Sequence, residues 1–239
     1  MEEVTVLSNH IEENIKILRA DIAEAAMACG RSPQDIRLVA AAKTNTAGDV
    51  AKAITAGVDA VGENRVQEML SKNAEGAYAG APLHFIGHLQ TNKVSKVVGL
   101  CNLIESVGSV KLIEMIGQKA ASKGLSQDIL IEVNIGEEPQ KSGILPRQLD
   151  ETLHFASETA GVNVLGIMSI PPIFDEISED YKFFEAMYNL FIDMSAKKYD
   201  NVSMRFLSMG MSDSYREAIS AGSNMVRIGS AIFGKRRLI

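Results

Sequence analysis

Cysteine is scarce in this 239-residue chain, and a long apolar segment is absent. The two cysteines, Cys29 and Cys101, lie far apart in the sequence, which excludes a disulfide scaffold and a cysteine-based zinc site. No stretch approaches the roughly 18–20 apolar residues that a membrane helix needs. The acidic start Met1-Glu2-Glu3 also lacks the basic and apolar regions of a signal peptide. We therefore expect a cytoplasmic protein that does not enter a membrane.

Basic residues are the minority among the charged ones. The chain has 24 Lys and Arg against 30 Asp and Glu, a formal net charge of −6. Nucleic-acid binding depends on clustered Lys and Arg that neutralise phosphates, so we expect no nucleic-acid partner. The four histidines do not stand at metal-ligand spacing, so we expect no metal site. A Gly-x-Ser-x-Gly motif and paired Cys and His are also missing, which leaves a hydrolase triad without support.

Eight short apolar segments alternate with helical patterns from Ile36 onwards. Repeated strand-then-helix units imply a parallel sheet, and eight of them imply closure into a (β/α)8 TIM barrel. An open doubly wound sheet is the alternative, but no Gly-x-Gly-x-x-Gly follows the first strand. We therefore expect a single α/β barrel domain over residues 1–239. The predicted strands are Ile36–Lys43, Ala60–Glu63, His84–His88, Leu103–Val107, Asp128–Ile135, Val162–Ile170, Val202–Met209 and Val226–Phe233.

The helical patterns between these strands carry capping signals. Ser109 and Asp213 are suitable N-caps, and glycines at 57, 124, 161 and 222 stand where C-terminal caps are expected. The predicted helices are Ala47–Ala56, Arg65–Asn73, Thr91–Val98, Val110–Lys123, Pro146–Thr159, Glu179–Lys197 and Asp213–Ala221.

An additional helix is predicted before the first strand, within residues 1–30. Ile11, Ile15, Leu18 and Ile22 recur at steps of four, three and four, which forms one apolar stripe. The segment Gly30-Arg31-Ser32-Pro33 ends this pattern. We expect the helix to pack on the outside of the barrel.

Active sites of barrel enzymes lie at the C-terminal ends of the strands. Lys43 follows the run Leu38–Ala42, so its amine would enter the barrel mouth. Burial lowers the pKa of a lysine, which suits a Schiff-base nucleophile. Position alone favours the alternative, in which the side chain extends to solvent at the strand end. The polar residues at the strand ends are Lys43, Glu63, Asn64, His88, Ser106, Asn134, Ser169, Ser208, Arg227 and Ser230.

Two glycine- and serine-containing segments follow the seventh and eighth strands, where barrels commonly bind phosphate. They are residues 207–212, with Ser208 and Gly210, and residues 226–230, with Gly229 and Ser230. The glycines permit close approach of an anion, and the helix N-termini that follow favour negative charge. Turn glycines and helix caps would give the same pattern, but two such loops coincide, so we favour phosphate binding.

Arg227 lies two residues before Gly229, on the same strand face. An arginine inside a barrel needs an acceptor. An ion pair with Glu63 or Glu132 and a hydrogen bond to a ligand heteroatom remain equal alternatives on this pattern.

The order of these motifs resembles the pyridoxal phosphate homeostasis proteins of the YggS/PROSC type, which are similar to the barrel domain of alanine racemase standing alone. The resemblance runs from the first strand to the last helix. The matching stretches are Ala42–Thr44, Gly62–Glu68, His84–Lys93, Ile104–Val107, Val133–Asn134 with Glu138 and Lys141–Gly143, Gly166–Pro171, Leu207–Asp213 and Val226–Gly234.

The resemblance implies that Lys43 forms a Schiff base with pyridoxal 5′-phosphate (PLP). It implies that Ser208, Gly229 and Ser230 hold the phosphate, that Arg227 faces the pyridine nitrogen, and that Asn64 lies near the ring. A cation beside that nitrogen makes the ring a poor electron sink, so strong turnover is not expected. The implied role is PLP storage and delivery, with PLP-dependent apoenzymes as candidate recipients and a monomeric state.

This sequence departs from the family pattern at several positions. Thr46 stands where the family commonly has proline, and Gly108 stands where aspartate is frequent. The other departures are Leu83 for tryptophan, Arg65 for tyrosine and Asn224 for threonine. These changes affect the loop after the first strand and the rim of the mouth, and leave the lysine and the phosphate loops in place.

Two enzymatic alternatives use the same lysine. A PLP-dependent racemase needs a second acid or base opposite Lys43, and in alanine racemase-like enzymes a second domain supplies that tyrosine. We expect no such domain here, and Tyr215 is the tyrosine nearest in sequence to the phosphate loops. A Schiff-base aldolase acting on a phosphorylated substrate would need an acid or base such as Glu63 near Lys43. The function of Lys141 is left open.

Overall fold

Eight parallel strands close into a barrel in chain order, with β1 paired to β8. The computed structural model describes the backbone of residues 2–172 and 177–234, and side chains from residue 10 to 172 and 181 to 234. The predicted TIM barrel is therefore confirmed. The strands are β1 (Arg37–Ala41), β2 (Ala60–Glu63), β3 (Leu83–Phe85), β4 (Leu103–Val107), β5 (Gln127–Glu132), β6 (Val162–Met168), β7 (Val202–Ser208) and β8 (Met225–Ile228).

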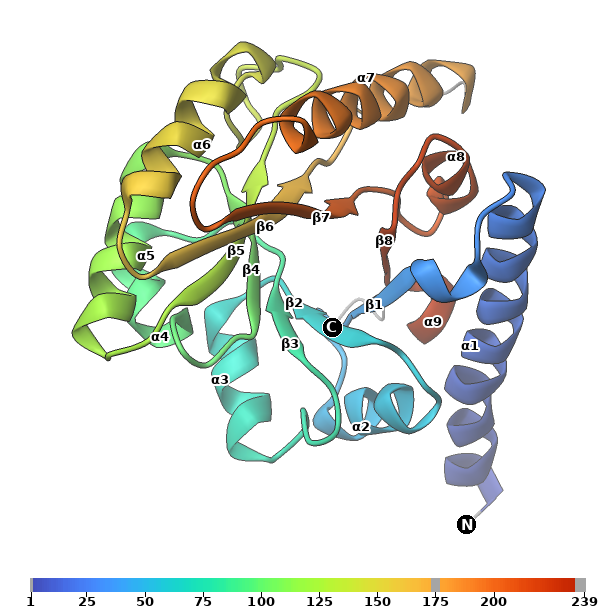
Figure 1. Cartoon of the computed structure of the whole chain (residues 1–239). Coiled ribbons are helices and arrows are strands. Elements are labelled where there is room, and N and C mark those ends of the chain that lie inside the picture. The colour runs from blue at the N-terminus through green and yellow to red at the C-terminus, as the bar shows by residue number, and fades with distance from the viewer. Residues whose placement is uncertain (1, 173–176, 235–239) are drawn as a thin grey trace.

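Helices surround the barrel between successive strands, as Figure 1 shows. Three short 3-10 turns precede β1, α4 and α6: η1 (Pro33–Asp35), η2 (Thr91–Lys93) and η3 (Pro146–Gln148). In the described part of the chain, no helix is both long and apolar enough to span a membrane. The helices are α1 (Glu2–Ala28), α2 (Ala47–Thr55), α3 (Val66–Ala74), α4 (Val94–Val97), α5 (Val110–Ser122), α6 (Leu149–Glu158), α7 (Ile177–Ser195), α8 (Tyr215–Ser220) and α9 (Ser230–Phe233).

The predicted last strand, Val226–Phe233, is wrong in its second half. Strand β8 ends at Ile228, and residues 230–233 form helix α9, in which the amide of Ile232 donates to the Gly229 carbonyl. A short apolar run fits a buried helix as well as a strand, so its periodicity could not separate the two. Ile232 is fully buried and packs into the apolar cluster shared with α1.

The two predicted N-caps had different outcomes. The Ser109 hydroxyl accepts a hydrogen bond from the Leu112 amide at 3.2 Å, as expected for an N-cap of α5. The Asp213 prediction is wrong, because α8 begins at Tyr215 and Ser214 occupies the N-cap position without a side-chain cap. The acid lies one residue too early in the loop to reach the amides of the first turn.

Apolar side chains fill the lower part of the barrel interior. They form a small cluster, Val39, Ala60, Leu103, Leu130, Met168 and Met225, with Leu165 and Phe206 packed against it. Because side chains alternate along a strand, the residues two positions further on reach the next layer towards the C-terminal ends. That layer contains Ala41, Gly62, Glu105, Glu132 and Arg227, so the barrel changes from apolar to polar below its mouth.

Helix α1 packs on the outside of the barrel, beside α2, α8 and α9 (Figure 1). The predicted stripe Ile11, Ile15, Leu18 and Ile22 is buried and forms one cluster with β1 and β8 side chains. The stripe prediction is thus confirmed.

Candidate functional site

Lys43, Asn64 and Gly229 follow three neighbouring strands at the barrel mouth. Strand β1 pairs with β2 and with β8, and the register places Ala40 beside Ile228. The residues just beyond these strand ends therefore meet at one side of the mouth. A Cβ atom at Gly229 would lie 3.2 Å from the Ala41 carbonyl oxygen, which shows how closely the two chain segments approach.

The turn after Lys43 is held by neighbouring side chains. The Asn45 side-chain amide donates to the Lys43 carbonyl at 3.1 Å, and the Thr44 backbone amide donates to Glu68 Oε2 at 2.9 Å. Thr44 adopts a φ of 64°, a conformation that β-branched residues rarely take. Such backbone strain persists only where surrounding contacts enforce it, and it concentrates at functional sites.

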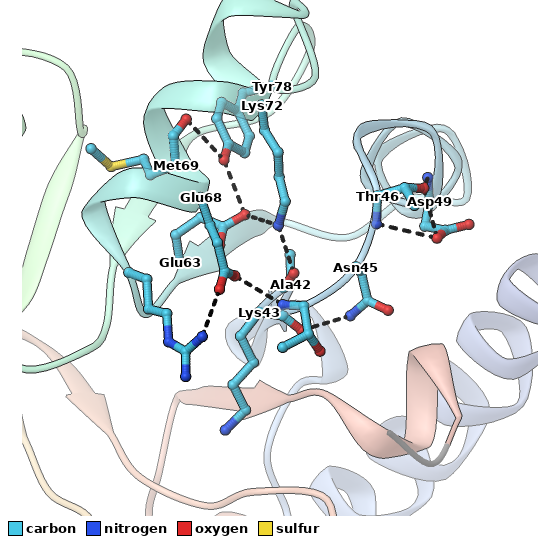
Figure 2. Close-up of polar contacts among 12 residues, drawn as sticks. Ala42, Lys43, Asn45, Thr46, Asp49, Glu63, Glu68, Met69, Lys72 and Tyr78 are labelled. Atoms are coloured by element: carbon cyan, nitrogen blue, oxygen red, sulfur yellow. Dashed lines mark hydrogen bonds and ion pairs between the residues drawn. The ribbon is translucent and has the colours of Figure 1, made fainter. Parts of the chain in front are cut away.

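Behind this turn, the fully buried Glu63 forms a cluster with the buried Lys72 and the half-buried Tyr78 (Figure 2). Lys72 Nζ lies 2.7 Å from Glu63 Oε1 and also donates to the Ala42 carbonyl at 2.8 Å. Burial raises the pKa of Glu63, although Lys72 opposes the shift. In Figure 2 the Lys43 side chain points away from this cluster. Glu63 is thus no partner for Arg227 and lies on the wrong side for an aldolase acid or base.

Arg227 lies in a chain of buried polar groups that crosses the barrel. Its guanidinium donates to Ser208 Oγ at 2.6 Å and to the Ser169 carbonyl at 2.8 Å. The Ser208 hydroxyl donates to Glu105 Oε2 at 2.6 Å, and His84 Nδ1 lies 2.7 Å from Glu105 Oε1. Because an ionised carboxylate only accepts hydrogen bonds, His84 Nδ1 carries the hydrogen.

The charges of this chain compensate one another. Burial alone would raise the pKa of Glu105, but the hydrogen bond and charge of His84 and the charge of Arg227 outweigh it, so the pKa is lowered. Burial lowers the pKa of Arg227, with Glu105 and Glu132 opposing. Neither ion-pair partner suggested by the sequence is the closest acid. That acid is Glu105, 4.0 Å from the guanidinium.

Ser208 lies deeper than the phosphate loops. It is fully buried, and its single hydroxyl hydrogen is used by Glu105. A phosphate contact of Ser208 stays a prediction, and it would require this hydrogen to leave Glu105. The observed geometry makes Ser208 the link that fixes the orientation of Arg227.

The loops after β7 and β8 meet through Ser212, which is not among the residues predicted for the site. Its hydroxyl oxygen accepts from the amides of Gly229 at 3.3 Å and Ala231 at 3.4 Å. The predicted phosphate residues Gly229 and Ser230 form the beginning of α9 at this point. Two side-chain atoms at the mouth, Asn64 Oδ1 and Ser169 Oγ, are buried without a hydrogen-bond partner among the described residues.

The other polar residues at strand ends form local contacts. Ser106 donates to the Gly87 carbonyl at 2.5 Å, and His88 Nδ1 lies 3.0 Å from Ser142 Oγ. The Asn134 side chain exchanges two hydrogen bonds with the backbone of Glu138 and closes the turn after β5. In the described ranges, no group of three or more His, Cys, Asp or Glu side chains lies together as metal ligands would.

None of the five tyrosines has a described contact at the barrel mouth. Tyr215 donates to Asp21 on α1, Tyr78 to Glu63 and Tyr199 to Asp150. Tyr181 and Tyr188 are exposed on α7. Tyr215 was the sequence candidate for a second acid or base, and its hydroxyl points to α1 because α8 packs against that helix.

Comparison with known proteins places this geometry in a family. The family model "Alanine racemase, N-terminal domain" matches residues 8–237. A pyridoxal phosphate homeostasis protein of Aquifex aeolicus is 37% identical over 90% of this chain and 94% of its own length. The protein of the same name from Escherichia coli is 36% identical over 95% of this chain and 97% of its own length.

Solved structures give the same result. An unknown protein from Bifidobacterium adolescentis has a TM-score of 0.89 and 33% identity, and the match covers 95% of this chain and 96% of that one. PipY of Synechococcus elongatus, solved with PLP bound, has a TM-score of 0.81 and 28% identity over 94% of this chain and 100% of its own. The chain therefore belongs to the family of pyridoxal phosphate homeostasis proteins, which shares its barrel with the N-terminal domain of alanine racemase.

Proposed function

We propose that this chain binds PLP at the barrel mouth, covalently through Lys43, and stores and delivers the cofactor without strong turnover. The names of its relatives and the PLP-bound state of PipY support this role. The single observation that carries it is the position of Arg227. Its guanidinium is fixed by Ser208 and Ser169 on the β8 wall, next to the strand that presents Lys43.

The residues at the mouth fit the cofactor. Asn64 Oδ1 is a buried acceptor and Ser169 Oγ a buried hydroxyl, both without partners, and the polar groups of the cofactor could form hydrogen bonds with them. Gly229 has no side chain, so a phosphate could approach its backbone at the start of α9. When bound, PLP supplies an aldehyde that a lysine amine can hold covalently and that another amine can reclaim.

Each residue of the site has its own task in this proposal. Lys43 presents the amine, and Ser230 binds the phosphate through its amide and hydroxyl. The Gly229 amide joins them by exchanging its 3.3 Å hydrogen bond to Ser212 Oγ for the phosphate. Asn64 positions the ring. Arg227 only donates hydrogen bonds, so it leaves the pyridine nitrogen unprotonated.

Weak turnover is part of the proposal for two reasons. An unprotonated pyridine nitrogen withdraws few electrons from the reacting carbon. Racemisation also needs a second acid or base. The hydroxyls of Tyr78, Tyr199 and Tyr215 donate to Glu63, Asp150 and Asp21 and therefore point away from the mouth. Fold similarity to an alanine racemase of Clostridium difficile, at 16% identity and a TM-score of 0.65, concerns the architecture alone.

A visible absorption spectrum tests the cofactor site directly. Protein purified with PLP should show a yellow absorption band. Borohydride should remove this band and leave the reduced cofactor covalently attached to the peptide that contains Lys43. Lys43→Ala should lack the band, whereas Lys52→Ala, a half-buried lysine of α2, should keep it. A colourless wild-type protein would overturn the proposal.

Two further assays separate a carrier from an enzyme. Loaded protein mixed with a PLP-dependent apoenzyme should restore that enzyme's activity faster than the same total PLP bound to serum albumin does. Alanine racemisation should stay near the rate of free PLP. Rapid racemisation would support the enzyme and contradict the carrier.

A further inference from the structure

A cavity of about 650 Å³ opens at the barrel mouth over the ends of β3, β4 and β5. This is the opposite side of the mouth from the wall formed by β8, β1 and β2. None of the proposed cofactor residues lines it. The lining residues are His88, Leu89, Gln90, Thr91, Asn92, Ser106, Gly108, Ser109, Leu112, Glu132, Ser142 and Gly143.

Glu132 is the charged group of this cavity. The residue is 7% exposed, and within the described ranges its carboxylate forms no hydrogen bond or ion pair. Burial raises the pKa of Glu132, and the charge of Arg227 only partly opposes this. The contrast with Glu105 is clear, because Glu105 accepts hydrogen bonds from both His84 and Ser208. A largely buried carboxylate without a hydrogen bond is costly, so a cationic ligand is favoured where Glu132 opens into the cavity.

The rest of the lining offers neutral hydrogen-bonding groups. Gln90, Thr91 and Asn92 contribute amides and a hydroxyl, and His88 forms its contact with Ser142 at the rim. No lysine or arginine is among the lining residues. The cavity therefore lacks a counter-ion for a carboxylate or phosphate, and its chemistry selects a positively charged ligand that also carries hydroxyl or amide groups.

Gly108 explains how the acid comes to lie here. A Cβ atom at this position would lie 2.8 Å from the Gly143 amide nitrogen and 3.2 Å from Glu132 Oε2. The absence of a side chain lets the turn at residues 142–143 close over the carboxylate. An aspartate at position 108 could not occupy the same space, so the acid of this cavity is supplied by β5.

We propose that this cavity binds a small primary amine in its ammonium form, with Glu132 as the counter-ion and residues 90–92 as partners for neutral polar groups. The inference deepens the proposed function, because an amine is the kind of molecule that reclaims an aldehyde from lysine. Binding itself needs no cofactor, so it can be tested without it.

Serinamide is a suitable probe, because it carries an ammonium, a hydroxyl and an amide. N-acetylserinamide has the same polar groups and no charge. PLP-free protein is titrated with each compound, and the amide shifts of uniformly 15N-labelled protein are followed. We expect serinamide to bind at least tenfold more tightly than N-acetylserinamide and to shift amides around residues 88–92, 106–109 and 132. Glu132→Gln should remove this preference, and Glu137→Gln, an exposed acid on the following loop, should retain it.

The folded state of each variant is checked from the same spectra. Equal binding of the two probes, shifts outside the cavity, or a preference that survives Glu132→Gln would overturn the inference. A second titration uses PLP-loaded protein after borohydride reduction, which blocks reaction with the probe. Serinamide should still bind, and its exclusion by the reduced cofactor would assign the cavity to the cofactor itself and overturn the inference. A protein that never takes up PLP would fail the absorption test while leaving the first titration decisive.

Discussion

Lys72 lies 2.7 Å from Glu63 in a buried ion pair directly behind the turn that presents Lys43. The same ammonium donates to the Ala42 carbonyl, the peptide group next to Lys43. The pair thus links α3 to the end of β1 from the outside of the barrel. This ion pair therefore fixes the backbone from which Lys43, the proposed cofactor lysine, extends.

Replacing Lys72 by Met should lower the free energy of unfolding by about 3–5 kcal/mol, because Glu63 would be left buried and uncompensated. Urea denaturation measures this change. Lys96→Met, an exposed lysine on α4, should cost less than about 0.5 kcal/mol. The double variant Glu63→Leu with Lys72→Met should recover most of the loss, and failure to recover would contradict the ion-pair explanation.

The Lys72→Met deficit should depend on pH. Glu63 has a raised pKa in the folded protein, so the folded state binds its proton more tightly than the unfolded state. Its destabilising effect is then absent below the ordinary pKa and complete above the folded pKa. Removing Lys72 raises that pKa further, so the deficit should be smaller near pH 5 than near pH 8. An equal deficit at both values would refute this assignment.

Glu105→Gln should destabilise the protein by about 3–5 kcal/mol, because Arg227 would be buried without its nearest compensating charge. The pKa of Glu105 is lowered, so its stabilisation is complete above the ordinary pKa of 4.5 and is lost as the pH falls through the folded value. Wild type and variant should therefore converge in acid below that pH. Glu151→Gln, on the exposed face of α6, serves as the control.

The same variant tests the position of Arg227. PLP affinity should fall about tenfold in Glu105→Gln, since the guanidinium loses the chain that orients it. The visible band should shift as well, because the charge beside the pyridine nitrogen changes. A merely structural role would lower stability and leave the band of the loaded protein unchanged.

Gly229→Ala should weaken PLP binding about tenfold while leaving the melting temperature within a few degrees. The new methyl group would lie 3.2 Å from the Ala41 carbonyl oxygen, and the backbone needs no positive φ there. It would occupy space proposed for the phosphate. Gly48→Ala in α2 meets nothing closer than 3.8 Å, so it should stabilise the protein by about 0.5–1 kcal/mol and leave PLP affinity unchanged.

Thr46→Ala should cost about 1 kcal/mol of stability. The Thr46 hydroxyl accepts from the Asp49 amide at 3.1 Å and donates to Asp49 Oδ2 at 2.8 Å, and both contacts are lost in the variant. The other half of the capping box, in which Asp49 accepts from the backbone amide of residue 46, is retained. Thr55→Ala at the other end of α2 removes only a bond to its own preceding turn and should be near neutral. Thermal denaturation of the two variants gives the comparison, and equal losses would contradict the capping assignment.

The capping box also accounts for a departure from the family pattern. Proline fixes the backbone before a helix and supplies no amide hydrogen, whereas Thr46 has a compatible φ of −75° and uses both its amide and its hydroxyl. The start of α2 is thus secured by hydrogen bonds instead of by a ring.

The barrel and the meeting of Lys43, Asn64 and Gly229 could be predicted, because parallel strands bring their C-terminal ends to one rim. The side of the strand on which each acid lies could not. Glu63 is at a strand end, but Gly62 occupies the inward position and the acid faces α3.

The acid that pairs with Arg227 could be identified only from the closed barrel. Glu105 and His84 lie on β4 and β3, across the barrel from β8, and their contact depends on strand register and barrel curvature. Local sequence contains neither. Alternation along β4 would have marked Glu105 as an inward acid, as it marks Glu132 on β5.

Helix α1 connects the beginning and the end of the barrel sheet in chain order. Asn14 donates to the Ile232 carbonyl at 2.9 Å on α9, and Arg19 pairs with Asp59 at 2.8 Å at the start of β2. Between these points runs the β1–β8 seam, where the last strand meets the first. Separation of that seam therefore requires α1 to undock, and we expect the amides of β1, β8 and α1 to exchange their hydrogens as one cooperative unit. A ligand held on this wall would slow exchange in a helix that never touches it.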